Sequence, residues 1–295
     1  MTPTVVVLGD VVTDVVARLR GPIAQGSDTG ARIARRPGGS AANVSAWLAT
    51  LGVPTVLVAR VGDDREGAEQ LDVLRRAGVR TRVAVDPERP TGTVVALVAP
   101  AGGRSMVTDR GANLALAVED VPDDEFRAGH HLHLSGYALL DRGPRAAARR
   151  ALALAREAGM TVSVDPSSAE PLTRVGPGRF LEWTRGVHTC LANLDEARAL
   201  TGLLPAQAAA RALTASYAEV VVTLGARGAL RAAAGSPDII RVPAPPVSVV
   251  DTTGAGDAFS AGFLAARGSG APALAALRGG AALAARAVAL TGARP

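Results

Sequence analysis

Lysine is absent from this 295-residue chain, so all 32 of its basic residues are arginines. A phosphate-binding loop of the Walker type requires a Gly-Lys pair and therefore cannot occur. Chemistry through a lysine Schiff base is excluded for the same reason. The arginines are scattered and aromatic residues make up only 3% of the chain. Because a nucleic-acid-binding surface needs clustered basic residues, we expect no nucleic-acid partner.

Cysteine and long apolar runs are also scarce. Cys190 is the only cysteine, which excludes an intrachain disulfide and a multi-cysteine zinc site. No apolar run approaches the roughly 18–20 residues of a membrane-spanning helix, and the first residues lack the features of a signal peptide. We therefore expect a cytoplasmic protein with no membrane partner. Hydrophobic residues make up 48% of the chain, as is typical of globular proteins.

Short valine-rich runs alternate with stretches of helical period along most of the chain. The apolar runs are residues 5–8, 55–59, 161–164 and 220–224, and the helical stretches are residues 40–51, 65–77, 144–158 and 206–216. Continuous apolar runs are typical of strands that are buried on both faces. This alternation predicts an α/β fold with a doubly wound, mostly parallel sheet flanked by helices. No linker-like segment divides the chain, so residues 1–295 are expected to form one domain.

Two regions interrupt the alternation. Residues 11–36 hold a polar, glycine-containing stretch between two strand-like runs, and residues 93–99 and 104–108 read as a hairpin. We expect segments of approximately 11–36 and 91–109 to form a small β-strand lid over a site. Its exposed strands could pair between two subunits of a homodimer.

The stretch 251–257, Asp-Thr-Thr-Gly-Ala-Gly-Asp, precedes a predicted helix over residues 258–267. Gly254 and Gly256 allow a tight turn that brings backbone N–H groups close to a ligand. A helix N-terminus attracts anions, and Asp257 would stand beside a bound anion, where it could take a proton from an attacking hydroxyl group. Such a cradle with one base suffices for phosphoryl transfer. The alternative is that Asp257 only stabilises the helix dipole, and the spacing does not decide between the two.

Three other templates for catalysis or cofactor binding are missing. The chain has no G-x-G-x-x-G dinucleotide fingerprint, no G-x-S-x-G nucleophile elbow and no H-E-x-x-H metal motif. These absences argue against an oxidoreductase and against the corresponding hydrolases.

The stretch 251–259 resembles the C-terminal signature of the ribokinase-like, or PfkB, carbohydrate kinase family. Further segments match that family in the same order, namely residues 8–14, 38–43, 61–67, 111–113, 193–196 and 223–228. The resemblance covers essentially the whole chain. It implies an ATP-dependent phosphotransferase that acts on a hydroxyl group of a small sugar or sugar-like acceptor. In this scheme Asp257 is the catalytic base, and the amides of Gly254, Ala255 and Gly256 form the anion hole.

The resemblance also assigns the acceptor site. The implied acceptor-binding residues are Asp14, Gly38, Gly39 and Asn43. A carboxylate such as Asp14 can accept hydrogen bonds from two sugar hydroxyls, although a solvated strand-end carboxylate would look the same. Ser40 has a structural alternative as the residue that caps the following helix.

The nucleotide and metal sites follow from the same resemblance. Implied nucleotide-binding residues are Asn193, Thr223, Gly225 and Gly228. Glu196 would hold Mg²⁺ through water, which suits an ion that retains most of its waters, although N-x-x-E is also the spacing of a helix capping box. Asp251 and Thr253 resemble a monovalent-cation site, where potassium would bind in some members of the family.

The identity of the acceptor is left open by the sequence. Ser40 stands where ribokinases carry lysine, so ribose is not the default acceptor. The lid segments contain no aromatic residue, which favours a sugar or sugar acid over a nucleoside, because bases are often held by stacking on aromatic rings. Tyr137 and Trp47 could still reach the site and hold a purine-type or pseudouridine-type nucleoside.

Two further alternatives concern arginine and histidine. A sugar phosphate would need basic groups, for which the candidates are Arg32, Arg35, Arg36 and Arg104. His131 and His133 share one face of a strand-like run, but a third metal ligand is missing from the nearby sequence. A non-catalytic sugar- or nucleotide-binding protein on the same fold is the remaining alternative, and the presence of Asp257 argues against it.

Overall fold

The computed structural model describes residues 3–100 and 103–295, and every range below refers to these. Its large sheet has nine strands in the order β13-β12-β11-β10-β9-β8-β1-β4-β5. The bounds are β1 (Val5–Leu8), β4 (Thr55–Gly62), β5 (Arg80–Asp86), β8 (His131–Ser135), β9 (Thr161–Asp165), β10 (Thr189–Asn193), β11 (Glu219–Thr223), β12 (Ala229–Ala233) and β13 (Ile240–Val242). Strands β11 through β5 in this order are parallel, and β12 and β13 extend one edge in antiparallel fashion. The predicted mostly parallel sheet is confirmed.

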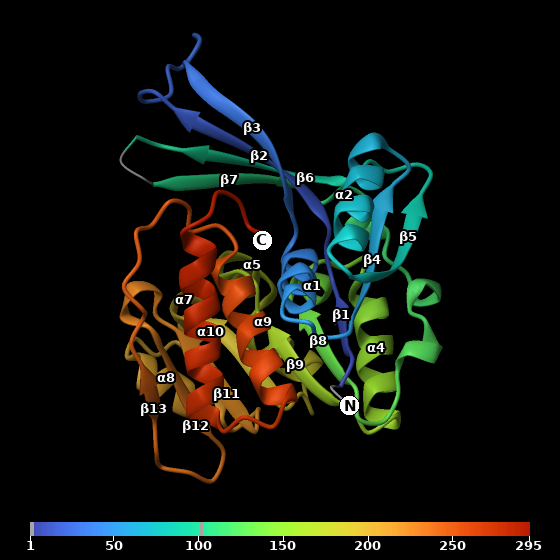
Figure 1. Ribbon diagram of the computed structural model, residues 1–295, viewed down its shortest axis with the longest axis vertical. Coiled ribbons are helices and arrows are strands. Elements are labelled where there is room, and N and C mark those ends of the chain that lie inside the picture. The colour runs from blue at the N-terminus through green and yellow to red at the C-terminus, as the bar shows by residue number, and fades with distance from the viewer. Residues whose placement is uncertain (1–2, 101–102) are drawn as a thin grey trace.

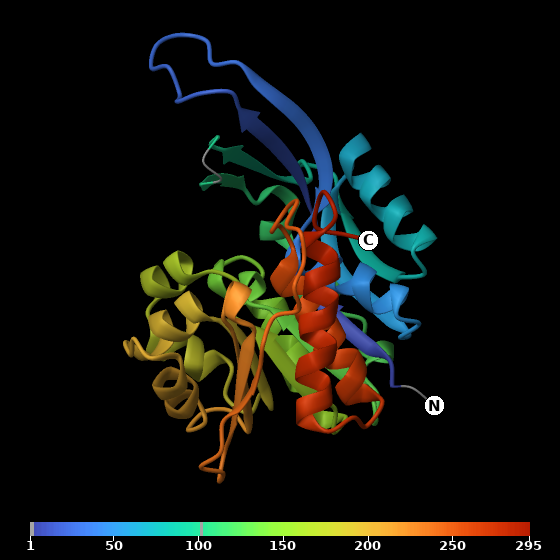
Figure 2. The ribbon, with the colours of Figure 1, turned by 60° about the vertical axis from the view of Figure 1, so that its left-hand side comes forward.

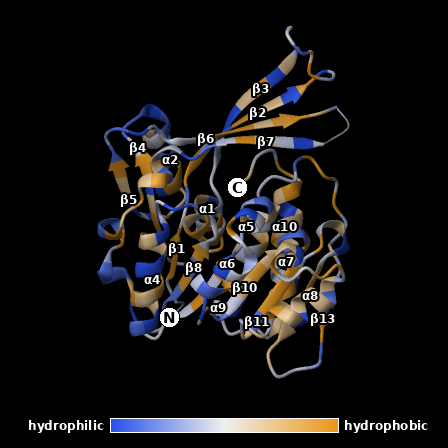
Figure 3. Cartoon of the chain, turned by 180° about the vertical axis from the view of Figure 1, so that it is seen from behind, coloured by the Kyte–Doolittle hydropathy of each residue, from blue (hydrophilic) through white to orange (hydrophobic). Residues whose placement is uncertain are grey.

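Helices cover both faces of this sheet (Figures 1 and 2). One face packs against α1 (Ser40–Thr50), α2 (Arg65–Arg76), α9 (Ala255–Gly268) and α10 (Ala273–Val288). The other packs against α3 (Tyr137–Leu140), α4 (Arg145–Glu157), α5 (Ala169–Val175), α6 (Pro177–Trp183), α7 (Leu194–Thr201) and α8 (Ala206–Leu213). Along β1, Val5 and Val7 join the first core, and Val6 and Leu8 join the second. Two buried faces explain why the strand is apolar at every position, as the colouring of Figure 3 shows for the central strands.

A second, four-stranded sheet lies across one end of the large one (Figure 1). Its order is β3-β2-β6-β7, with β2 (Val12–Leu19), β3 (Ala31–Gly38), β6 (Gly92–Val98) and β7 (Arg104–Asp109). The segments 11–36 and 91–109 supply these strands, and β6 and β7 form the predicted hairpin. Part of the expected hairpin turn, residues 101–102, lies outside the described residues. We refer to this element below as the small sheet.

The loop that connects the two sheets is pinned by one asparagine. Asn113 accepts a hydrogen bond from the backbone N–H of Val11 and donates to the Val11 carbonyl, at 2.9 and 2.8 Å. Val11 is the last of the three residues between β1 and β2, so Asn113 fixes the point where the chain passes from the large sheet to the small one. Among the described residues, no helix combines the length and apolar character that crossing a membrane would require.

Candidate active site

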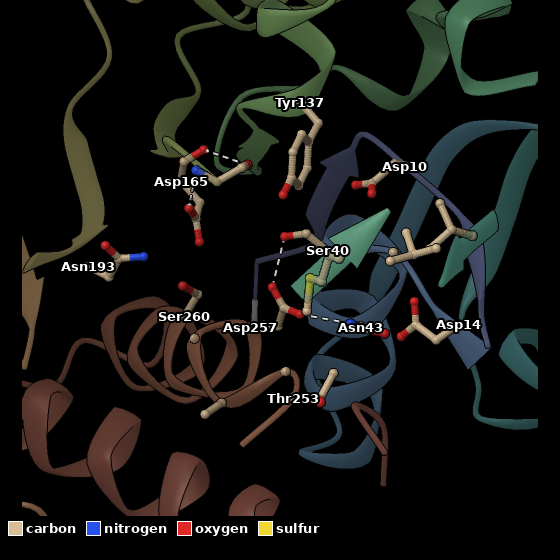
Figure 4. A pocket seen from close by; sticks show the side chains of 18 of the residues that line it. Asp10, Asp14, Ser40, Asn43, Tyr137, Asp165, Asn193, Thr253, Asp257 and Ser260 are labelled. Carbon is tan, nitrogen blue, oxygen red and sulfur yellow. Dashed lines mark hydrogen bonds between the residues drawn. The ribbon is translucent and has the colours of Figure 1, made fainter. Parts of the chain in front are cut away.

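The carboxyl ends of the parallel strands meet below the small sheet. Asp10 follows β1, while Asp165, Asn193 and Thr223 are the last residues of β9, β10 and β11. Ligands of open α/β sheets bind at this edge. A cavity of about 330 Å³ lies here, between the large sheet, α9 and the small sheet (Figure 4). Of the residues expected from the sequence, it is lined by Asp14, Gly39, Asn43, Asn193, Glu196, Thr223, Thr253, Gly254, Ala255, Gly256 and Asp257.

Asp257 lies in the first turn of α9 and faces the N-terminus of α1. Ser40 donates its hydroxyl to Oδ1 of Asp257 at 2.8 Å, and the Asn43 amide donates to Oδ2 at 2.8 Å. These two contacts hold both oxygens of the carboxylate in a fixed orientation at the cavity wall (Figure 4). Residues more than 200 positions apart are therefore joined into one polar cluster.

The environment of Asp257 makes its carboxyl group a strong proton acceptor. Burial raises its pKa to about 8, and the nearby carboxylates of Asp165 and Asp10 act in the same direction. The hydrogen bonds from Asn43 and Ser40 act in the opposite direction. A carboxyl group with a pKa near neutrality is suited to general base catalysis.

The structural alternative for Ser40, that it caps α1, does not hold. Gly39 is the N-cap residue and Ser40 is the first residue of the helix. Gly39 has φ of 96°, and a Cβ at this position would lie 2.5 Å from the Asp10 carbonyl oxygen. Only glycine therefore allows α1 to begin directly against the chain leaving β1, and Ser40 is left free to contact Asp257.

Asp14 points into the cavity from β2 of the small sheet (Figure 4). A Cβ on Gly38 would lie 2.5 Å from the Asp14 carboxyl carbon, so glycine is required beside it. Burial raises the pKa of Asp14 to about 7, while the positive charge of Arg294 lowers it. Gly38 itself does not line the cavity and supports Asp14 from behind.

A second, mostly apolar cavity of about 460 Å³ adjoins the first. It is lined by Gly225 and Gly228 together with proline, valine and alanine side chains from residues 244–249 and α10. Thr223, Thr252, Ala255, Gly256 and Phe259 line both cavities. The start of α9 therefore forms the boundary across which two ligands would meet.

Asn193 and Glu196 form the capping box that their spacing allows. Asn193 Oδ1 accepts from the Glu196 N–H, and the Glu196 carboxylate accepts from the backbone and side-chain N–H groups of Asn193, at 2.6–2.9 Å. Glu196 is nonetheless at the cavity wall, and burial raises its pKa to about 7. Burial and the charge of Glu196 also raise the pKa of Asp165 well above its usual value. Two buried carboxyl groups whose ionisation is opposed by burial and by neighbouring negative charges are a suitable environment for a divalent cation.

Asp251 is surrounded by donors. Its Oδ1 accepts from the backbone and hydroxyl of Thr253, at 3.0 and 2.7 Å. Its Oδ2 lies 3.4 Å from both Arg18 Nη2 and the Gly292 N–H, and Arg104 Nη1 lies 3.8 Å from Oδ1. Burial raises the pKa of Asp251, but these donors outweigh it and the net shift is downward. Asp251 is not among the residues that line either cavity.

Several side chains considered from the sequence lie elsewhere. Trp47 is fully buried in the core and donates its indole N–H to the Ala293 carbonyl, so it does not reach the cavity. Tyr137 does line it, with the guanidinium of Arg110 4.4 Å from its ring centre. Among the arginines considered for an acceptor phosphate, only Arg104 lines the cavity, and Arg35 instead pairs with Glu66 at 2.6 Å. The two others are Arg32 and Arg36, both exposed.

His131 and His133 do not line this cavity, and their rings contact serine and threonine hydroxyl groups instead. Both rings are hydrogen bonded to the Ser163 hydroxyl at 2.8 Å, and His131 also contacts Thr161. Burial lowers the pKa of His131 to about 3 and that of His133 to about 4, so both are neutral. In the part of the chain that the structure describes, no cluster of three or more metal-ligating side chains occurs.

Four charged residues belong to the site although sequence reasoning assigned them no role there. Asp10, Asp165 and Arg110 line the cavity, and Arg294 is buried behind Asn43. Asp10 and Asp165 each stand at the end of a valine-rich run, and the position of a carboxylate just past a parallel strand could have identified them. For Arg294 the local sequence carries no such signal.

Comparison with known proteins agrees with this geometry. The family model of the pfkB family carbohydrate kinases matches residues 2–295. A fructokinase of Escherichia coli is 33% identical over 274 residues, which cover 90% of this chain and 84% of the relative. The crystal structure of adenosine kinase from Sinorhizobium meliloti matches with a TM-score of 0.90 at 28% identity, covering 100% of this chain and 96% of the other.

A third comparison concerns a structure with bound ligands. Fructokinase from Vibrio cholerae O395, solved with fructose, ADP and calcium ion, matches with a TM-score of 0.85 at 28% identity, covering 99% of this chain and 94% of the other. The fold, the two adjoining cavities and the sequence likeness over nearly the whole chain agree. The chain belongs to the pfkB family of carbohydrate kinases and is an ATP-dependent sugar kinase.

Proposed function

We propose that Asp257 is the general base of this kinase and removes the proton from the acceptor hydroxyl. The observation that carries this proposal is the position of its carboxylate, which Ser40 and Asn43 fix at the wall of the first cavity, directly after Gly256, a residue that lines both cavities. The raised pKa of Asp257, about 8, gives it the basicity that proton abstraction needs. The released proton passes to the Asp257 carboxylate as the hydroxyl oxygen attacks the γ-phosphorus of ATP. The bond between that phosphorus and the oxygen bridging to the β-phosphate breaks, and ADP leaves.

The backbone at the start of α9 stabilises the transferring phosphoryl group. Gly254 is the N-cap residue with φ of 73°, and Ala255 and Gly256 open the helix. The N–H groups at a helix N-terminus attract anions, and those of Gly254, Ala255 and Gly256 would lie beside the group in transfer. Asp257 is in the same turn, which brings base and anion hole together.

ATP would occupy the apolar cavity of about 460 Å³. Its alanine, valine and proline lining suits an adenine ring, and Gly225 and Gly228 allow close backbone approach. Thr223 and Asn193 would face the phosphates, since both residues end strands at the cavity boundary. The triphosphate would then point toward Gly256 and Asp257.

A divalent cation, which we propose is Mg²⁺, would be held near Asp165 and Glu196. These residues suit a cation, because burial and neighbouring negative charges raise the pKa of both carboxyl groups and a cation would relieve that repulsion. When bound, the ion would neutralise phosphate charge. Asp165 and Glu196 orient it, through water where Mg²⁺ keeps its hydration.

Potassium fits the Asp251 site less well. Both oxygens of Asp251 already accept from N–H or O–H donors, and the guanidinium groups of Arg18 and Arg104 supply positive charge there. We therefore propose that turnover does not require potassium at Asp251 and Thr253.

The charge of the acceptor cavity favours a neutral acceptor. Five carboxyl groups from described residues line it, against two guanidinium groups. Arg110 is paired with Asp10 and Asp141, at 3.3 and 3.2 Å, and Arg104 donates to Thr253 at 2.6 Å. Neither arginine is available for an anion without losing these contacts. A neutral sugar therefore fits better than a sugar acid or a sugar phosphate.

A nucleoside is the second candidate, supported by the roof of the same cavity. The inner face of the small sheet is apolar there, and its residues are Val12, Val16, Val94, Ala96 and Met106. Such a face suits a flat ring attached to the sugar, because binding there removes apolar surface from water.

The test is ADP formation by the purified protein with ATP and Mg²⁺, across neutral sugars, nucleosides, sugar acids and sugar phosphates. We expect turnover with a neutral sugar or a nucleoside, and a kcat/KM lower by at least about 10²-fold for a matched anionic analogue, since like charges repel strongly in such sites. A preference for the anionic analogue would contradict the assigned acceptor class. Turnover of a nucleoside but not of its free sugar would decide for the second candidate.

A further inference from the structure

Arg294, in the segment that follows α10, is a buried charge beside the acceptor site. Its side chain donates from Nε to Oδ1 of Asn43 at 2.9 Å and from Nη2 to the Gly38 carbonyl. The residue is 7% exposed, and its Nη1 has no hydrogen-bond partner among the described residues. Burial lowers the pKa of Arg294 to about 10, so the guanidinium remains charged at neutral pH.

The contact with Arg294 fixes which way the Asn43 amide points. The oxygen of that amide accepts from Arg294, so its nitrogen must point the other way, where it donates to Asp257 Oδ2 at 2.8 Å. A rotated amide would place two donors against each other at one end and two acceptors at the other. Arg294 thus reaches Asp257 through one intervening side chain.

The same guanidinium also places a positive charge near several carboxylates of the site. Attraction to the negative charges of Asp14, Asp257 and Asp10 opposes the effect of burial on Arg294. The groups that face Asp257 are otherwise acidic or neutral, namely Asp10, Asp165 and Glu196 with Ser40 and Asn43. Removing Arg294 would take away a positive charge that interacts with Asp14, Asp257 and Asp10.

The backbone beside Arg294 is held as firmly as its side chain. The Ala293 carbonyl accepts the Trp47 indole N–H at 2.9 Å. A Cβ on Gly254 would lie 2.7 Å from Ala293, so the turn before α9 packs directly on this segment. Ala293 and Arg294 therefore contact three parts of the site: α1, the small sheet at Gly38, and the turn before α9 at Gly254.

We propose that Arg294 is a positioning residue that orients Asn43 toward Asp257 and supplies a buried positive charge beside the acceptor site. The proposal rests on Asp257 being the general base. It gives this buried arginine a part in the reaction, although it lines neither cavity. Its effect on turnover passes through Asn43 and through charge.

The direction in which the pH profile shifts follows from the effect of each contact on a pKa. The Asn43 hydrogen bond lowers the pKa of Asp257, and the charge of Arg294 lowers the pKa of Asp14. A neutral side chain at position 294 removes the charge effect on Asp14 and leaves the Asn43 amide free to rotate, which weakens its hydrogen bond to Asp257. Both pKa values are then expected to rise. Because an ionised Asp257 is needed, the acidic limb of kcat/KM moves to higher pH.

The experiment compares Arg294→Met and Arg294→Lys with the wild type, in pH profiles of kcat and kcat/KM together with melting temperatures. The wild type should show an acidic limb near pH 8. In Arg294→Met the limb should move up by about 1 pH unit or more, as expected when an opposite charge is lost, and kcat/KM on the plateau should fall by about 10²-fold. Arg294→Lys keeps the charge and should show a smaller shift. The matched control is Arg241→Met, an exposed arginine on β13 that should leave the profile unchanged.

A double-mutant cycle with Asn43→Ala tests whether Arg294 acts on Asp257 through Asn43. If Arg294 acts through Asn43, the shift caused by Arg294→Met becomes smaller in the Asn43→Ala background, and additive shifts would exclude this route. A lower melting temperature with an unmoved limb would show that Arg294 is only structural. If Arg294→Met does not fold, the neutral polar variant Arg294→Gln decides, because an unmoved limb there overturns the proposal.

The role of Asp257 as the base and the role of Arg294 as a positioning residue can be disproved separately. A wild type with no acidic limb, together with an active Asp257→Asn variant, would remove the base itself. A clear limb in the wild type that neither Arg294 variant moves would leave the base intact and remove only the role of Arg294.

Discussion

Gly254 and Gly256 lie one residue apart at the start of α9 but differ in their surroundings. Gly254 has φ of 73°, and a Cβ there would lie 2.7 Å from Ala293. Gly256 has no heavy atom within 4 Å of the corresponding Cβ position and lines both cavities. The first glycine is therefore required by the fold, and the second by the ligand.

This difference predicts opposite outcomes for two alanine variants. Gly254→Ala should lower the free energy of unfolding by about 1–3 kcal/mol, because a left-handed conformation is strained for alanine. Gly256→Ala should leave stability nearly unchanged and raise the KM for ATP, since the new methyl group occupies space beside the phosphates. Chemical denaturation and steady-state kinetics on both variants check this, and equal stability of the two would be evidence against the assignment.

Not every residue of the site could be predicted from the sequence. Asp257 and Asn43 stand in recognisable stretches, so their importance was visible locally. Arg294 meets Asn43 across 251 positions of sequence, and only packing brings them together. Trp47 was wrongly considered for the cavity because a helical pattern shows that a face is buried without showing what covers it. The capping alternative for Ser40 stayed open because the close approach of Gly39 to Asp10 is a long-range contact.

At the scale of elements, the strands were the most predictable part. Val5–Leu8 was expected as a strand with the bounds it has, because a run that is apolar at every position has to be buried on both faces. The small sheet was foreseen as extra strands, but its contribution to the cavity depends on which face turns inward. That face follows from the pairing of β2 with β3 and β6, which one chain segment alone does not reveal.

The small sheet contacts the segment before α9 through Arg104 of β7. Arg104 of β7 donates to Thr253 at 2.6 Å and lies near Asp251. We expect Arg104→Ala to raise the KM for the acceptor, because this contact helps to hold β7 over the cavity. Arg32→Ala, an exposed arginine of the same sheet, is the matched control.

The same arginine bears on the cation requirement. Turnover of the wild type should be equal in potassium and in tetramethylammonium salts, and Arg104→Ala should become responsive to potassium once Asp251 has lost this neighbour. A wild type that is inactive without potassium would contradict the role given to Arg18 and Arg104.

At the scale of the whole molecule, the small sheet leaves apolar side chains on its outer face. Ile33 of β3 is 65% exposed and Val107 of β7 is 63% exposed. We propose that two copies associate through this sheet. Ile33→Asp should then shift the protein toward monomer in sedimentation equilibrium, while Leu204→Asp, at a 72% exposed position on another part of the surface, should not. A wild type that is monomeric at every accessible concentration would remove the proposal.

The central claim is that Asp257 takes the acceptor proton in an ATP-dependent phosphoryl transfer. The most direct measurement is the single-turnover rate of Asp257→Asn with the acceptor that the wild type uses, beside ATP and acceptor binding measured by calorimetry. Asp238→Asn, at an exposed carboxylate, is the control and should react at the wild-type rate. The account predicts unchanged folding and binding and a rate lower by at least about 10²-fold. An Asp257→Asn variant that transfers phosphate at the wild-type rate would contradict it.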